Sequence, residues 1–195
     1  MEKRGAAQAL QAAGMTRRAQ IGWSDEFRIG LYGSTRKVLA PRGIKVVQPV
    51  ELSRDWYHLA VTVNPRTGQL VWSWLVGTAS KDIAPAVAEW QAAGFDGVVW
   101  DGLTAHHGAP VRAVGMALIE QPASSPELNP AERIGEAIRA KTEGKVYGTI
   151  WKKMAAVEAV LRELAADPER VKRLVGWHWI LQSLKQLPWK RKGSQ

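Results

Sequence analysis

Three acidic residues lie at positions where an ionised carboxylate is either energetically unfavourable or well placed to bind a ligand. Asp25 lies in an alternating apolar stretch, on the face that such a strand buries, where an ionised group must be compensated. Asp101 directly follows the continuous apolar run 97–100, and ligand groups collect at the carboxyl ends of buried parallel strands. Glu132 lies at the predicted start of a helix. These three residues are the candidates for chemistry.

Oxygen ligands from two strands and a helix start can hold Mg²⁺, which accepts one or two carboxylates and keeps several waters. Two such ions about 3.5–4 Å apart activate a nucleophile and stabilise the leaving oxygen of a phosphodiester. Clustered carboxylates repel one another unless a cation neutralises them. Asp25, Asp101 and Glu132 therefore predict metal-dependent phosphoryl transfer with two Mg²⁺ ions, for which Mn²⁺ substitutes.

Each acid also has a plainer interpretation. Backbone donors can satisfy Asp25, and Asp101 with the glycine after it forms a common turn pair. Asn129 can cap a helix whose third position is Glu132, which is where a capping-box glutamate belongs. Glu127, on the turn before that helix, is an alternative candidate for the third acid.

The elements that must position these acids follow from periodicity and turn residues. A short helix is expected within the lead-in 1–20. Strands are expected at 21–30, 57–63, 69–76, 97–100 and 118–121, with a further extended segment at 37–50 that Pro41-Arg42-Gly43 interrupts. Helices are expected at 83–93, from 110, from 129, at 146–166 and from 168, with Asp167 as an N-cap. The order predicts an α/β fold with a mixed sheet, in which 21–145 form the main domain and 146–195 a basic helical C-terminal extension.

Composition points to an acidic partner. The 195 residues carry a net charge of +9, and the sequence has no cysteine, which excludes disulfides and thiolate metal sites. Residues 1–132 hold 13 basic and 12 acidic side chains, whereas residues 133–195 hold 14 and 6. A field of one sign over the last third favours nucleic acid, although a solvated helical surface would also account for it.

Candidate phosphate contacts follow from this charge distribution. His106 is a further candidate, for phosphate or for support of the metal site, although a plain loop histidine accounts for it equally well. Most of the ten tryptophans lie in apolar patterns, which favours core packing over base stacking. The basic candidates for contacts with DNA are Arg42, Lys152, Lys153, Arg170, Lys172, Arg173, Lys190, Arg191 and Lys192.

Four segments occur in the order found in one enzyme family. They are Ser24-Asp25-Glu26-Phe27, then Leu39-Ala40-Pro41-Arg42-Gly43, then Trp100-Asp101-Gly102 with His106, and finally Ser125-Pro126-Glu127-Leu128-Asn129-Pro130-Ala131-Glu132. In these motifs the chain resembles the catalytic domain of DDE transposases, in the bacterial insertion-sequence branch of the mariner-like superfamily. The likeness covers residues 20–140, and the last motif is the most specific.

The resemblance implies an RNase H-like fold with Asp25, Asp101 and Glu132 as the catalytic triad. It implies metal-dependent DNA cleavage at the ends of a mobile genetic element, followed by strand transfer of the freed 3′-hydroxyl into target DNA, that is, DNA recombination and integration. The expected partners are double-stranded DNA and either a second copy of the chain or a separate helix-turn-helix polypeptide. No membrane partner is expected, and the expected location is cytoplasmic, at the nucleoid.

The sequence also departs from the family. Gly102 replaces the usual asparagine, Leu39 replaces a tryptophan, and about 20 residues precede the first motif, too few for a helix-turn-helix region that recognises ends. Two alternatives therefore stand beside an active transposase domain. One is an inactive truncated transposase that binds DNA or a partner, and the other is an RNase H-like endonuclease without a role in transposition.

Overall fold

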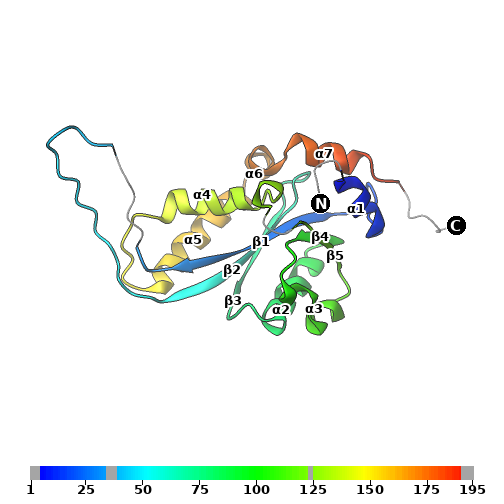
Figure 1. Cartoon of the computed structure of the whole chain (residues 1–195), viewed down its shortest axis with the longest axis horizontal. Helices are drawn as coiled ribbons and strands as arrows, with labels where there is room; N and C mark the ends of the chain where they lie inside the picture. Colours follow the sequence, from blue (N-terminus) through cyan, green and yellow to red (C-terminus); the bar gives the residue numbers. More distant parts are fainter. Residues whose placement is uncertain (1–4, 34–38, 123–124, 190–195) are drawn as a thin grey trace.

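Five strands form one mixed sheet in the order β3-β2-β1-β4-β5 (Figure 1). The strands are β1 (Ile21–Gly30), β2 (Trp56–Val63), β3 (Leu70–Leu75), β4 (Gly97–Trp100) and β5 (Ala117–Glu120). β1 pairs antiparallel with β2 and parallel with β4, while β2–β3 is antiparallel and β4–β5 parallel. This computed structural model describes residues 5–33, 39–122 and 125–189. The predicted mixed α/β sheet is confirmed.

Helices cover both faces of the sheet. They are α1 (Ala6–Ala12), α2 (Ser80–Ala92), α3 (Ala109–Ala113), α4 (Glu132–Thr142), α5 (Ile150–Ala165), α6 (Pro168–Val175) and α7 (His178–Lys185), with 3-10 turns η1 (Thr104–His107) and η2 (Pro126–Leu128). One face packs on α2 and α3. The other packs on α4, α5 and α6 at one end and on α1 and α7 at the other. No helix in the described ranges is long and apolar enough to cross a membrane.

The alternation in β1 decides which side chains reach each layer. Ile21, Trp23, Phe27 and Ile29 are buried on the face that α4 and its neighbours cover. Asp25 occupies the same face by the period of two, as predicted. Glu26 therefore leaves the strand on the α2 side.

The interrupted extended segment expected at 37–50 joins no sheet over its described residues. Residues 39–55 form an exposed arm without helix or strand, which reaches away from the sheet in Figure 1. Its apolar side chains have no partner strand, so Val47 is 77% exposed and Leu52 is 73% exposed. Hydrogen bonds join the arm to the end of β1, from Leu31 N to Asp55 O and from Gly33 N to Glu51 O.

The helix expected to continue from 168 is two helices. Gly176 separates α6 from α7, and a Cβ there would lie 2.5 Å from the carbonyl oxygen of Lys172 and 3.2 Å from that of Pro65. The chain can approach the β2–β3 turn this closely only because this position has no side chain. The predicted N-cap at Asp167 is confirmed, since its carboxylate accepts from Arg170 N at 2.9 Å.

The helix expected from 146 begins later, at Ile150. Thr149 caps it, and its hydroxyl accepts from Lys152 N. Gly148, at φ +76°, occupies the left-handed region just before the cap and ends the preceding loop. α5 packs in the same apolar cluster as α4 and β1. The division of the chain at residue 145 stays a prediction.

Candidate active site

Asp25 carries the most perturbed carboxyl group of the site. Its pKa is raised from 3.8 to about 8, first by burial, then by the negative charges of Glu132 and Glu26, with a smaller contribution from Asp101. A hydrogen bond from Glu26 N to Asp25 Oδ1, 2.9 Å long, acts in the opposite direction. The site therefore holds more negative charge than its own cations neutralise.

Glu132 joins Asp25 at one cavity. It is the first residue of α4, and both side chains line a cavity of about 270 Å³ between β1 and α4. α4 comes this close to the strand because Gly135 faces Phe27, and a Cβ at Gly135 would lie 2.5 Å from the phenyl ring. Arg139 is the nearest cation to Glu132, at 3.9 Å from Nη2 to Oε2.

Asn129 ties the start of α4 to β1. Its Nδ2 donates to the carbonyl oxygen of Ser24 at 2.9 Å, and its Oδ1 accepts from Ala131 N at 3.1 Å. The capping-box interpretation is wrong, because α4 begins at Glu132 and its N-cap Ala131 makes no side-chain cap. The amide of Asn129 instead fixes Glu132 relative to the strand that carries Asp25.

Asp101 lies directly after β4, as predicted, but its carboxylate belongs to a different cluster. Its Oδ1 lies 2.9 Å from Nδ1 of His106, and Nε2 of His106 lies 3.0 Å from Oε1 of Glu26. The imidazole is 1% exposed and stacks on Trp100, with 3.6 Å between ring centroids. It links two acids across the end of the sheet.

These neighbours favour the charged form of His106. Burial alone would lower its pKa, but the hydrogen bond and charge of Glu26, together with Asp101, outweigh burial and raise the pKa above its usual value. An imidazolium donates from both nitrogens, which suits two carboxylate partners. His106 is therefore placed to orient acids and, being buried, does not contact phosphate.

Glu26 is the functional candidate that sequence reasoning missed. The alternation places the Glu26 side chain on the face opposite Asp25, where an acidic residue is ordinary and predicts no function. In the structure its side chain is 11% exposed and is paired with His106. The available signal was the histidine that follows Asp101 by five residues, which marks a charged partner near the strand ends.

The donor set suits a hard divalent cation, although the acids are not gathered into one ligating cluster. Within the described ranges no group of three or more metal-ligating side chains is close enough to hold an ion. Asp25 and Glu132 share a cavity, whereas Asp101 is turned to His106. All the donors are carboxylate oxygens, and their uncompensated charge, visible in the raised pKa of Asp25, is what Mg²⁺ or Mn²⁺ would neutralise.

Lys153 is a correction to the candidate DNA contacts. It is 5% exposed, and its Nζ donates to Gly30 O at 2.6 Å and to Glu143 Oε1 at 3.1 Å. The helical period does give a signal of this burial, because Lys153 lies three residues after Ile150 and four before Val157, on the face that α5 buries.

The other basic candidates for contacts with DNA differ in whether their side chains are free at the surface or already paired with an acid. Arg42, Lys152 and Arg173 are exposed. Arg170 is paired with Glu163 at 2.7 Å and Lys172 with Glu169 at 2.5 Å. Lys190, Arg191 and Lys192 lie outside the described residues.

The strand order, the mixed pairing and the two helical layers define an RNase H-like fold, as found in transposase and integrase catalytic cores. The Mos1 mariner transposase in its paired-end complex with Mn matches 94% of this chain and 60% of its own, with a TM-score of 0.64 and 14% identity. The corresponding complex with Mg gives 0.64 and 15%. The catalytic core of BIV integrase matches 80% of this chain and 94% of its own, with a TM-score of 0.51 and 10% identity.

The chain spans about 60% of the length of the Mos1 chains that it matches. No protein-family model matches the chain, and no curated protein sequence matches it. At these low identities the structural likeness establishes the fold.

Proposed function

We propose that this chain is the catalytic part of a DDE-type transposase, of the bacterial insertion-sequence branch, which cleaves DNA and transfers the freed 3′ end. The observation that carries the proposal is that Asp25 and Glu132 line one cavity, at the centre of an RNase H-like sheet. The motifs that carry Asp25, Asp101 and Glu132 lie on or beside β1, β4 and α4, and the solved structures with the same fold include a Mos1 strand transfer complex.

Asp25, Asp101 and Glu132 are the residues that would hold two Mg²⁺ ions, for which Mn²⁺ substitutes. Bound ions supply activation of the attacking oxygen and stabilisation of charge on the leaving oxygen. His106 orients Asp101 and Glu26, and Asn129 holds Glu132 beside β1. Neither of these two needs to contact the DNA.

Double-stranded DNA is the proposed partner, as transposon ends and as target. Exposed Arg42, Lys152 and Arg173 are the described basic candidates that remain available for phosphate. A homodimer, or a separate helix-turn-helix polypeptide, would supply recognition of ends, since phosphate contacts carry no sequence information. The proposed location is cytoplasmic, at the nucleoid.

One observation favours a second candidate function. Asp101 is already paired with His106, so only two of the three proposed catalytic acids, Asp25 and Glu132, line the same cavity. An inactive transposase remnant that binds DNA or a partner would retain this arrangement. An RNase H-like endonuclease without strand transfer is the further alternative.

Nicking of supercoiled plasmid with Mg²⁺ or Mn²⁺ tests the proposal. We expect Asp25→Asn, Asp101→Asn and Glu132→Gln each to lower nicking by at least about 100-fold, because each removes an oxygen ligand charge. Glu127→Gln is the matched control, an exposed acid on η2 that should leave nicking unchanged. Full cleavage by Asp101→Asn would overturn the triad.

Transfer of a labelled 3′-hydroxyl end into plasmid separates the enzyme classes. A transposase joins the end to the target, whereas a simple endonuclease only cleaves. A folded, DNA-binding parent that neither nicks nor joins either needs its recognition partner or is an inactive remnant, and adding a helix-turn-helix polypeptide that restores nicking would decide for the partner.

A further inference from the structure

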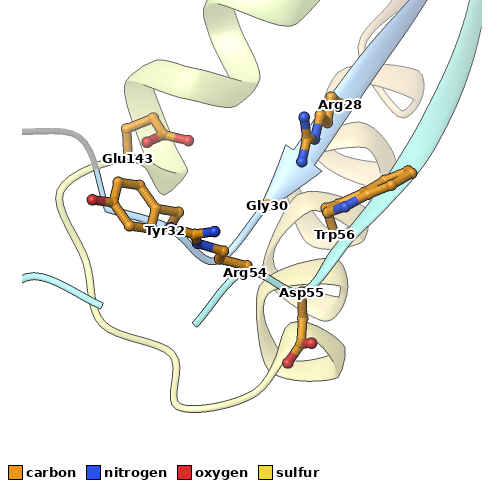
Figure 2. Close-up of a pocket in the computed structure, with 7 residues that line it drawn as sticks. All are labelled: Arg28, Gly30, Tyr32, Arg54, Asp55, Trp56 and Glu143. Carbon is orange, nitrogen blue, oxygen red and sulfur yellow. The ribbon is translucent and has the colours of Figure 1, made fainter. Parts of the chain in front are cut away.

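The α2 side of the sheet is not covered along its whole length. The apolar cluster under α2 and α3 includes Ala60 of β2 but no residue of β1. Beyond that cluster, the ends of β1 and β2 border a cavity of about 500 Å³, at the base of the arm (Figure 2). Its volume falls in the range of small-molecule sites, about 300–1,000 Å³.

Two planar groups form one side of this cavity. The guanidinium carbon of Arg28 lies 4.6 Å from the ring centroid of Trp56, and Trp56 is 43% exposed. The ring of His58 meets Trp56 edge-on, with 4.8 Å between centroids, which fixes the indole from the strand side. Unpaired bases stack on both tryptophan and arginine planes, whatever their sequence.

The cavity also offers positive charge that its own acids do not take up. Arg28 and Arg54 line it, and within the described part of the chain neither guanidinium forms an ion pair. Glu143 is bound to Lys153 at 3.1 Å. Asp55 accepts from Ser53 Oγ at 2.9 Å, and its carboxylate points away from Arg28 in Figure 2.

The cavity adjoins the candidate active site. Arg28 lines both this cavity and the cavity that Asp25 and Glu132 share. Trp56 pairs with Gly30, five residues along β1 from Asp25, so a DNA strand with a phosphodiester at those acids would extend by roughly 16 Å and pass the end of β1 to reach Trp56. This step rests on the proposed function, whereas the stacking surface itself does not.

We propose that this cavity binds an unpaired nucleotide of single-stranded DNA. The base stacks on the Arg28–Trp56 pair, and Arg54 contacts a phosphate. Such a site would hold the strand that separates from the duplex next to the cleaved bond.

A short single-stranded oligonucleotide carrying 2-aminopurine tests the site directly, because stacking quenches the fluorescence of this base. The parent should bind it with quenching. Trp56→Ala should weaken binding by about tenfold and abolish the quenching, while Trp56→Phe should retain part of both. Arg54→Ala should weaken binding and lower the dependence on salt by about one phosphate contact.

Two variants are matched controls. Trp151 is 62% exposed and packs against Tyr57 on the opposite face, so Trp151→Ala should bind as the parent does. Arg162 is exposed on α5, also on that face, and Arg162→Ala should behave likewise. The proposal is overturned if the parent fails to bind the oligonucleotide, or if Trp56→Ala and Trp151→Ala bind it equally.

Plasmid nicking separates this proposal from the proposed function. A parent that binds through Trp56 but does not nick, even with the helix-turn-helix polypeptide added, supports the nucleotide site and overturns the enzyme. A parent that nicks, with oligonucleotide binding that is insensitive to Trp56, supports the enzyme and overturns the site.

Discussion

Asp25 and Glu26 are neighbours on β1, and their side chains leave the strand on opposite faces. On the α4 side, Asp25 and Glu132 share a cavity that Arg28 and Arg139 also line, and Arg139 lies 3.9 Å from Glu132. On the α2 side, Glu26 and Asp101 are joined by the buried imidazole of His106 at 3.0 and 2.9 Å. The acids on the α2 side thus have a partner within the protein, whereas burial and the neighbouring carboxylates favour a protonated Asp25 on the α4 side unless a cation binds there.

The largest effect is expected from breaking the cluster of Glu26, His106 and Asp101. His106→Ala leaves Glu26 buried without a partner, which should lower the free energy of unfolding by about 3 kcal/mol. Urea denaturation measures this. His107 is the control, since its side chain is 43% exposed and its loss should cost under about 0.5 kcal/mol.

This contribution depends on pH in a defined direction. Because the folded pKa of His106 is raised, its stabilisation is present below the usual imidazole pKa and is lost as the pH rises through the raised value. The gap between the parent and His106→Ala should therefore shrink from pH 6 to pH 9. A constant gap would show that packing on Trp100, not charge, is what His106 supplies.

The cavity of Asp25 and Glu132 depends on the close approach of α4 to β1, and Gly135→Ala should disturb that approach. The added methyl group would lie 2.5 Å from the ring of Phe27 and must push the helix or the ring aside. We expect a loss of about 2 kcal/mol in the free energy of unfolding. Phe27→Leu in the same chain should restore part of that loss, and no restoration would locate the clash elsewhere.

Asp25→Asn tests the uncompensated charge itself. Since the pKa of Asp25 is raised to about 8, the folded state retains a proton that the unfolded chain releases, and stability falls as the pH rises from about 4 towards 8. Without metal, Asp25→Asn should be more stable than the parent by about 1–2 kcal/mol at pH 8, with allowance for partial exposure. At pH 4 the two should coincide. Glu127→Gln should show no such crossover.

The smallest expected effect is the response to divalent ions. Mg²⁺ or Mn²⁺ at a few times its dissociation constant should stabilise the parent by about 1 kcal/mol, seen as a rise of a few degrees in Tm. Asp25→Asn should lose this response, and His107→Ala should keep it. An equal rise in the parent and in Asp25→Asn would place the ion away from this cavity.

Sequence reasoning found the residues that strand geometry fixes. The period of two placed Asp25 on the buried face, and the apolar run before Asp101 predicted β4. It missed Glu26, because its partner His106 approaches from a turn that no periodicity describes. It expected an extended segment at 37–50 but not an arm that leaves the sheet, since local residue types do not reveal whether a partner strand exists.

The helices likewise show that local features can be predicted from the sequence, whereas contacts with distant residues cannot. Asp167 was predicted as a cap because its hydrogen bond is local, within three residues. The break at Gly176 depends on Pro65, more than 100 residues earlier in the chain, and could not be predicted. The partners of the buried Lys153, Gly30 and Glu143, are likewise brought to it only by the folded chain.

The bond from Asn129 to Ser24 has a mechanical consequence. Ser24 directly precedes Asp25, and Asn129 lies three residues before Glu132, so this hydrogen bond links the two acids through only a few residues of chain. Together with the close packing of Gly135 on Phe27, it ties the start of α4 to β1 at the cavity. A movement of α4 relative to β1, on binding of DNA or a second subunit, would therefore have to break this bond before it could separate the two carboxylates.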